Sequence, residues 1–184
     1  ITGASGSVYA VEFVKLMAEL NVEVHGILSS AGEQVLQLET GKSPEDLSSV
    51  SRWFDIDNFA APVASGSSRY HGMVVLPCSM GTLGGIANGI SKNLIHRAAD
   101  VILKERRPLV LAVRETPLNR VHLHNMLNAN DAGAIICPAM PAFYHKPQSI
   151  TELAVDFSCR ISQLLGIEVP GMSRWQGIAE DKEP

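Results

Sequence analysis

Residues 2–7 read Thr-Gly-Ala-Ser-Gly-Ser, a turn of small residues almost at the start of the chain. Such a turn typically follows a β-strand and opens a helix, and residues 8–20 carry a helical pattern. Only Ile1 precedes the turn, so we expect the strand that leads into it to lie mostly ahead of Ile1. The stretch therefore predicts the strand–turn–helix unit of an α/β sheet.

Apolar runs alternate with helical patterns along the rest of the chain. Short buried strands are predicted at residues 22–28, 73–76, 109–113 and 134–137. Helices are predicted at residues 8–20, 32–39, 93–106, 120–130 and 151–165. This alternation indicates one domain built on a parallel sheet that is covered by helices on both faces.

Composition limits the class of function. The 184 residues are 46% hydrophobic and 18% charged, which predicts a well-covered core and a sizeable subunit interface. A net charge of −4 without a basic tract argues against a nucleic-acid partner, and no apolar run has membrane-spanning length. Three cysteines without C-x-x-C spacing predict free thiols in a reducing compartment, the cytoplasm.

Polar and glycine-rich clusters follow the predicted strands. They comprise residues 2–7, 29–30, 77–82, 114–115 and 138–147. The carboxyl ends of parallel strands meet at one edge of a sheet, where ligands bind in open α/β folds. We therefore expect a binding site along that edge.

Several of these clusters are neutral and combine hydroxyl groups with glycines, a set that can hold a phosphate or serve only as caps and turns. An NAD site is disfavoured, because Ser7 and Tyr9 stand where a dehydrogenase fingerprint has glycines. The Gly41-Lys42-Ser43 segment lacks the upstream glycine of a P-loop. A mononucleotide such as FMN suits these clusters better.

A second set of residues is charged. Arg97 and Lys104 lie two helical turns apart and so share a helix face with Asp100. A second anionic substrate would account for this set together with residues 114–115. The helix face could equally be a salt-bridged surface, which is what we expect of residues 105–107. The histidines show no ligand spacing, so no metal site is expected.

Several longer strings occur in order between Thr2 and about Leu165. They include T-G-A-S-G (2–6), L-E-T (38–40), L-P-C-S-M-G-T-L (76–83), N-L-I-H-R-A-A-D-V-I-L-K-E-R-R-P (93–108) and P-A-M-P-A-F-Y-H-K-P-Q (138–148). With these strings the chain resembles the UbiX/Pad-type flavin prenyltransferases. The last string departs from the P-x-M-N-x-x-M-W segment of the related cysteine decarboxylases.

The resemblance implies a Rossmann-like, flavodoxin-like doubly wound fold, with a flavoprotein domain over residues 1–166. Residues 167–184 are then expected to form a tail that is frayed or packed on a neighbouring subunit. It also implies a homo-oligomer, commonly a dodecamer built from trimers. The implied reaction is metal-independent: the dimethylallyl group of dimethylallyl monophosphate joins N5 and C6 of reduced FMN. The product, prenylated FMN, serves UbiD-type decarboxylases in ubiquinone biosynthesis and aromatic-acid metabolism.

The resemblance also assigns site residues. The implied FMN contacts are Gly3, Ala4, Ser5, Ser29, Ser79, Met80, Gly81, Thr82 and Arg97. The implied prenyl-phosphate contacts, some of them from an adjacent subunit, are Lys104, Arg114, Glu115, Tyr144 and Arg160. Catalytic roles are implied for Ser5, Glu39 and Glu115, the first two in proton transfer. Phe59 stands where relatives often carry an aromatic residue.

Two other functions fit the same residues. One is an FMN-dependent decarboxylase that acts directly on an aromatic acid. The other is a non-catalytic carrier that delivers FMN to a partner. A carrier has no need of several basic residues beside the flavin, so the charged set favours an enzyme.

Overall fold

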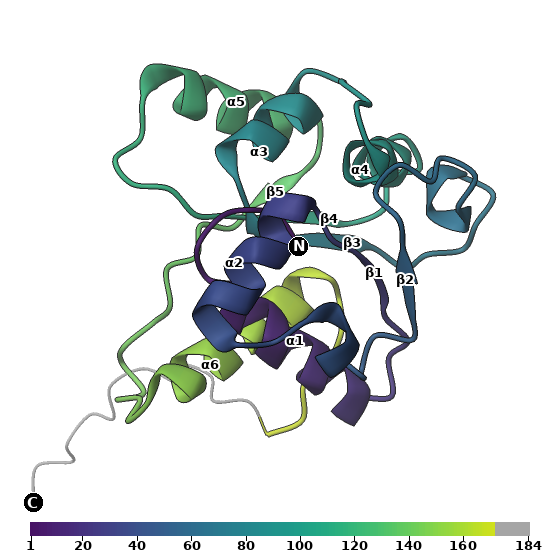
Figure 1. Ribbon diagram of the computed structural model, residues 1–184. Helices are drawn as coiled ribbons and strands as arrows, with labels where there is room; N and C mark the ends of the chain where they lie inside the picture. Colours follow the sequence, from purple (N-terminus) through teal and green to yellow (C-terminus); the bar gives the residue numbers. More distant parts are fainter. Residues whose placement is uncertain (172–184) are drawn as a thin grey trace, which may run out of the picture.

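The computed structural model, which describes residues 1–171, contains short parallel strands in two sheets. In the first sheet β1 (His25–Ile27) pairs with β2 (Arg52–Phe54). In the second sheet β4 (Leu109–Val113) lies between β3 (Met73–Cys78) and β5 (Ile135–Ile136). Helices cover both faces, with α3 and α5 on one side and α1 and α6 on the other (Figure 1). The predicted α/β fold with a parallel sheet is thus confirmed.

Six α-helices connect the strands. They are α1 (Ser7–Glu19), α2 (Ser30–Thr40), α3 (Met80–Ala87), α4 (Leu94–Lys104), α5 (Arg120–Asp131) and α6 (Ile150–Leu164). Two short 3-10 helices, η1 (Pro44–Asp46) and η2 (Pro62–Ala64), lie in the loops on either side of β2. Each helix from α2 to α6 begins after a Ser or Asn whose side chain accepts a hydrogen bond from the N–H three residues later. No helix among residues 1–171 is long and apolar enough to cross a membrane.

One strand and one α-helix were not predicted. Residues 52–54 form β2, and residues 80–87 form α3. Strands β1 and β5 are also shorter than predicted, whereas β4 has the predicted bounds. All five residues of β4 are buried, as expected for a central strand covered on both faces.

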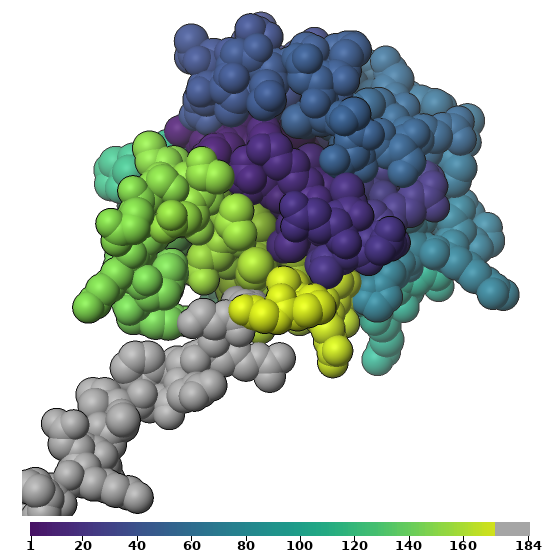
Figure 2. Space-filling view, turned by 90° about the horizontal axis from the view of Figure 1, so that it is seen from below, coloured from purple at the N-terminus to yellow at the C-terminus, as the bar shows by residue number. Residues whose placement is uncertain are grey.

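The core below the sheet forms around α1. This helix lies between the segment that follows β1 and helix α6, as Figure 2 shows from below. Met17, Leu36 and Ile161 are completely or almost completely buried there. Ile167 and Val169, at the start of the expected tail, pack against this core of the same chain. The rest of that tail, residues 172–184, lies outside the described residues.

Candidate functional site

Three loops at the carboxyl edge of the strands contact one another. The buried Thr2 hydroxyl donates to the Pro77 carbonyl (2.7 Å) and accepts from the Ser79 N–H (2.9 Å). The Ser29 N–H donates to the Ile1 carbonyl (3.1 Å). These bonds bring the amino-terminal ends of α1, α2 and α3 together, as the sequence predicted for the clusters at this edge.

Two glycines shape this edge. A Cβ on Gly3 would lie 2.6 Å from the Ala31 Cβ, so the first loop approaches α2 as closely as it does only because residue 3 has no side chain. A Cβ on Gly81 would meet no atom within 4 Å, so the first turn of α3 faces open space. Free space beside helix N–H groups and hydroxyls fits a flat, phosphate-bearing group such as FMN.

The serines at this edge serve as helix caps. Ser29 Oγ accepts from the Gly32 N–H (3.0 Å), which leaves the Ser29 proton available for a ligand. Ser79 Oγ accepts from the Thr82 N–H (3.4 Å) and donates to Thr82 Oγ1 (3.1 Å). Ala4 and Met80, two further predicted FMN contacts, are buried. A serine here can therefore cap a helix and also contact a ligand. Ser29 can do both because its own proton is not used by the cap.

A cleft of about 540 Å³ opens beside the first turns of α1. It brings together three of the predicted site residues, Ser5, Glu39 and Arg114. The remaining walls come from α1, the end of α2 and two other segments, and comprise Gly6, Val8, Tyr9, Val11, Glu12, Lys15, Thr40, Lys42, Ala139 and Ile150. The cleft thus combines a carboxylate, a hydroxyl and a guanidinium group.

Glu39 caps α1 from the end of α2. Gly6, the residue before α1, has φ of 116° and no side chain with which to cap the helix. The Glu39 carboxylate instead accepts from the N–H of Gly6 (2.9 Å) and of Ser7 (2.8 Å). Burial raises the pKa of Glu39, but the Ser5 hydroxyl and these N–H groups outweigh it, so the pKa lies below its usual range. Glu39 is therefore ionised at neutral pH.

This arrangement predicts a pH-dependent stability. Because the pKa of Glu39 is lower in the folded chain than in the unfolded chain, its contribution is complete above the unfolded value, about 4.3. It is lost as the pH falls through the folded value. We expect Glu39→Gln to lower the Tm at pH 7 more than at pH 3, as measured by thermal denaturation at both pH values. An equal effect at the two pH values would mean that the ionised carboxylate does not cap α1.

Arg114 is the arginine of the cleft, which is also lined by Lys15 and Lys42. Its backbone N–H donates to the Cys78 carbonyl (3.1 Å), which fixes the end of β4 against the end of β3. Its side chain is exposed in the cleft and can meet an anion. Burial raises the pKa of nearby Tyr9, and the Arg114 charge opposes that rise. Glu115 points its carboxylate at the adjacent Thr116 N–H (3.0 Å) and does not line the cleft.

Tyr9 and Lys42 were not predicted as site residues, yet both line the cleft. Lys42 stands in the segment that was rejected as a P-loop, and that rejection holds because the segment follows a helix, not a strand. No sequence signal marked Lys42, because spacing does not show that the turn after α2 faces the cleft. Lys42 adds a cation to Arg114 and to Lys15, which is paired with Glu12, and so strengthens the cleft as an anion site.

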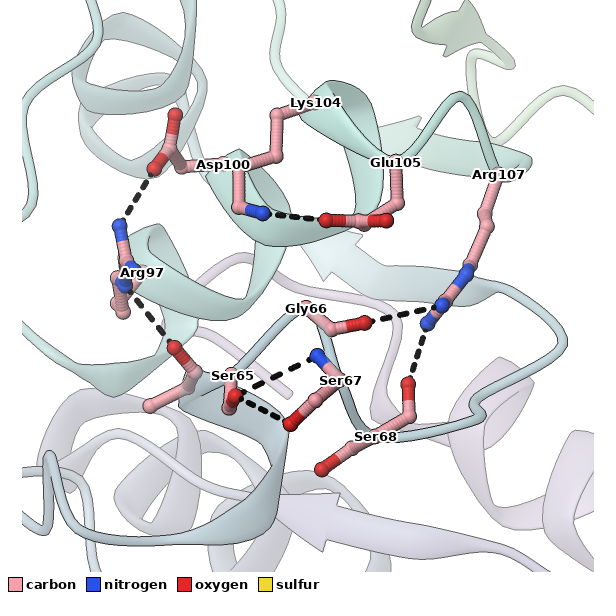
Figure 3. Close-up of polar contacts among 10 residues, drawn as sticks. Ser65, Gly66, Ser67, Ser68, Arg97, Asp100, Lys104, Glu105 and Arg107 are labelled. Carbon is pink, nitrogen blue, oxygen red and sulfur yellow. Dashed lines mark hydrogen bonds and ion pairs between the residues drawn. The ribbon is translucent and has the colours of Figure 1, made fainter.

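Arg97 and Lys104 lie elsewhere in the chain. Arg97 on α4 forms an ion pair with Asp100 (2.8 Å) and donates to the Ala64 carbonyl (3.1 Å). Lys104 pairs with Glu105, next to the loop of residues 65–68 (Figure 3). The predicted shared face of Arg97 and Asp100 is confirmed. Neither Arg97 nor Lys104 lines the cleft.

The position of Arg107 differs from the one expected from the sequence. Residues 105–107 were expected to form a solvated, salt-bridged face, which holds for Glu105 but not for Arg107. The Arg107 guanidinium donates to the carbonyls of Ser68 (2.6 Å) and Gly66 (3.1 Å) and so fastens the loop of residues 65–68 (Figure 3). A Cβ on Gly66 would overlap the Lys104–Glu105 pair, so this loop depends on glycine for its close approach.

Tyr144, Arg160 and Phe59 complete the predicted set. Tyr144 lies between β5 and α6, is 53% exposed and packs edge-on against the His145 ring. Arg160 on α6 donates to Gln163 Oε1 (3.3 Å). Phe59 lies in the loop after β2 and is 47% exposed. None of the three lines the cleft, so one chain gathers only part of the predicted site.

The cysteines are poor nucleophiles. All three are free, and burial raises the pKa of Cys78 to about 12. Burial also raises the pKa values of Cys137 and Cys159. They act as small buried side chains, as predicted. Among residues 1–171, no three His, Cys, Asp or Glu side chains gather as metal ligands.

Comparison with known proteins places this site in a family. Residues 1–157 match the Flavoprotein family. Flavin prenyltransferase UbiX of Deinococcus radiodurans is 45% identical over 177 residues, which cover 96% of this chain and 91% of that protein.

Two solved structures are similar over nearly the whole chain. The crystal structure of AnUbiX (PadA1) in complex with FMN and dimethylallyl pyrophosphate has a TM-score of 0.93 at 43% identity, covering 96% of this chain and 95% of that one. The dodecameric FMN-dependent Ubix-like decarboxylase from Escherichia coli O157:H7 has a TM-score of 0.91 at 40% identity, covering 95% and 96%. With its fold, its cleft and these likenesses, the chain belongs to the flavin prenyltransferase UbiX family of flavoproteins.

Proposed function

We propose that this chain joins the dimethylallyl group of dimethylallyl monophosphate to reduced FMN, giving prenylated FMN. The observation that carries the proposal is the cleft in which Arg114 and ionised Glu39 lie beside the loop of residues 2–6. Membership of the UbiX family supports the flavin and the transfer, and the relative with FMN and dimethylallyl pyrophosphate supports a prenyl phosphate as donor. When bound, reduced FMN supplies N5 and C6 as the nucleophilic atoms.

The residues of the cleft have distinct tasks in this reaction. Cleavage of the allylic C–O bond leaves extra negative charge on the phosphate, which Arg114 and Lys42 stabilise. Glu39 is ionised, so it takes up a proton that the reaction releases, and the Ser5 hydroxyl is its neighbour in the cleft. The open first turn of α3 and the Ser29 hydroxyl hold the flavin in register with the prenyl group.

The predicted site residues that lie outside the cleft of their own chain are proposed to reach the cleft of a neighbouring copy. We assign Arg97, Lys104, Glu115, Tyr144 and Arg160 to this shared site in a homo-oligomer, a dodecamer built from trimers. The dodecameric relative from Escherichia coli supports this assembly. Exposed apolar side chains on and beside α5 also support it, because Leu118, Val121, Leu123 and Leu127 are all at least 42% exposed.

The product is expected to leave for another enzyme. Prenylated FMN is a cofactor, so a UbiD-type decarboxylase is the proposed recipient. We place the reaction in the cytoplasm, whose reducing conditions suit three free cysteines.

The mass of the bound flavin after incubation with both substrates tests the proposal. The protein is incubated without oxygen with reduced FMN and dimethylallyl monophosphate, and the bound flavin is analysed by mass spectrometry. We expect a flavin heavier by one five-carbon isoprenyl unit. Unmodified FMN under these conditions would sink the proposal.

A direct decarboxylase is the second candidate, because the similar Escherichia coli structure is described as an FMN-dependent decarboxylase. It predicts release of carbon dioxide from an aromatic acid by the protein and FMN alone. The prenyltransferase predicts no such release unless a UbiD-type enzyme is added. A mere carrier predicts neither carbon dioxide nor a modified flavin.

Lys42→Ala is expected to raise the KM for dimethylallyl monophosphate about fivefold to tenfold with a smaller change in kcat, because the cleft loses one of its cations. Steady-state kinetics with varied prenyl phosphate measure this. Lys15→Ala is the matched control, since Lys15 lines the same cleft but is paired with Glu12 at 2.7 Å. Equal KM changes in the two variants would remove Lys42 from the phosphate site.

A further inference from the structure

A turn of three serines and one glycine lies beside the carboxyl-terminal end of α4. Residues 65–68 read Ser-Gly-Ser-Ser, and the Ser68 N–H closes the turn on the Ser65 carbonyl (3.2 Å). Within the turn the Ser65 and Ser67 hydroxyls pair with each other (2.9 Å). The proposed function gives this turn no task, although it lies next to Lys104, which is assigned to the shared site (Figure 3).

Two arginines hold this turn at alternate carbonyl groups. Arg97 Nε donates to the Ala64 carbonyl (3.1 Å). The Arg107 guanidinium donates to the carbonyls of Gly66 (3.1 Å) and Ser68 (2.6 Å). Arg97 lies in the first half of α4 and Arg107 just beyond its last residue, so the turn is fastened at both ends. Hydrogen bonds from a charged donor are strong, which makes the turn a firm surface beside α4.

Gly66 lies directly against the Lys104 ammonium group. A Cβ on Gly66 would lie 2.5 Å from Lys104 Nζ and would also overlap the Glu105 carboxylate. The backbone of Gly66 does not itself require glycine, because its φ is not in the positive range. The glycine therefore leaves space for the ends of these two side chains.

The Lys104 ammonium group is held in place but is still accessible. Lys104 pairs with Glu105, and the two side chains are 47% and 33% exposed. An ion pair with this exposure is weak, so a phosphate with two negative charges can replace the carboxylate. A lysine side chain loses rotational freedom when it binds an anion. Contact with the turn removes part of that cost before the anion arrives.

We propose that Gly66 and Arg107 are positioning residues for the prenyl phosphate, because together they set the place of the Lys104 ammonium group. This inference rests on the proposed function, in which Lys104 meets the phosphate in a site shared between copies of the chain. Arg107 keeps the turn against the end of α4, and Gly66 leaves the room that the ammonium group needs. Both residues act through Lys104 and not by touching the substrate.

The variant Gly66→Ala tests the steric part of the proposal. The atoms nearest the added methyl group are the ends of the Lys104 and Glu105 side chains, which can move aside. We therefore expect the fold to persist, with a Tm within about 2 °C of the unchanged protein. Dimethylallyl monophosphate is titrated into protein that holds oxidised FMN, which does not attack the prenyl group, and the Kd is measured by calorimetry. The Kd is expected to rise about fivefold to tenfold.

A double variant shows whether Gly66 acts through Lys104. Lys104→Met is expected to raise the same Kd about tenfold, because the phosphate loses a cation. Adding Gly66→Ala to Lys104→Met is expected to cause no further rise, since the group that the methyl displaces is already absent. A further rise equal to the effect of Gly66→Ala alone would overturn the proposal. An unchanged Kd for Gly66→Ala would overturn it as well.

The variant Arg107→Met tests the hold on the turn, and Arg106→Met is the matched control because Arg106 is exposed. We expect only Arg107→Met to raise the Kd, about threefold to tenfold, and to speed hydrogen exchange of the Ser68 amide about threefold or more. Arg107→Lys keeps one charged donor and is expected to recover part of the affinity. Equal exchange and equal Kd values in the Arg106→Met and Arg107→Met variants would remove the positioning role from Arg107.

The outcomes separate this proposal from the proposed function, because the Kd values are measured without turnover. If the Kd depends on Lys104 and Gly66 as stated but reduced FMN stays unmodified, the positioning role stands and the proposed function fails. If prenylated FMN forms but the Kd is the same with and without the Cβ at Gly66, the positioning role fails and the function stands. A protein that does not bind dimethylallyl monophosphate would contradict both.

Discussion

Replacing Arg114 with Met is expected to lower kcat/KM for prenyl transfer by about a hundredfold to a thousandfold, the loss typical of removing a group that stabilises transition-state charge. Arg114 is one of three cations, with Lys15 and Lys42, that line the cleft beside Ser5 and Glu39. Methionine keeps much of the side chain's length without the charge. Product formation at several prenyl phosphate concentrations measures the effect.

The control for this variant is Arg69→Met, because Arg69 is also exposed but does not line the cleft. FMN binding, followed by flavin absorbance, is expected to persist in both variants, since the proposed flavin contacts lie on the adjacent loops. A rate for Arg114→Met within threefold of the unchanged protein would mean that the departing phosphate does not meet Arg114.

Replacing Glu39 with Gln is expected to lower kcat about a hundredfold or more while FMN remains bound. The amide cannot take up a proton, although one oxygen still accepts from the first turn of α1. The expected pH profile also changes. The decline in kcat on the acid side, which reflects protonation of Glu39, is expected to disappear in the variant. Rates of single turnovers between pH 3 and pH 8 measure both effects.

Glu33→Gln is the matched control for this second variant. Glu33 lies in the first turn of the same helix, is exposed and does not line the cleft. Its kcat and pH profile are expected to match those of the unchanged protein. An unchanged rate for Glu39→Gln would withdraw the proton-transfer role and leave Glu39 only as the cap of α1.

Strong local signals explain the part of the fold that was predictable. Helix α5 begins at the predicted residue, because Asn119 is a good cap. Strand β4 has the predicted bounds, because five consecutive apolar residues are buried on both faces. Helix α3 escaped prediction because glycines weaken the helical pattern. One of them, Gly85, is needed for packing, since a Cβ there would lie 2.6 Å from His96 Nε2.

The candidate site was predictable only in part, because local sequence signals do not show which distant segments meet in the fold. The clusters at the carboxyl edge indicated Ser5 and Arg114, whereas Glu39, near the end of α2, was implied only by the resemblance of the L-E-T string. Lys42 was missed because sequence spacing does not reveal that the turn after α2 faces the end of β4. Spacing also could not show that Arg97 and Lys104 lie apart from Arg114 within one chain.

Each turnover of this chain is expected to transfer one prenyl group to flavin and to expel one phosphate. The reaction is run for a single turnover without oxygen, with reduced FMN and dimethylallyl monophosphate, and is quenched at several times. Inorganic phosphate and prenylated flavin are then quantified in the same samples. We expect the two to rise together in a one-to-one ratio. Phosphate release without any modified flavin, or no release at all, would contradict it.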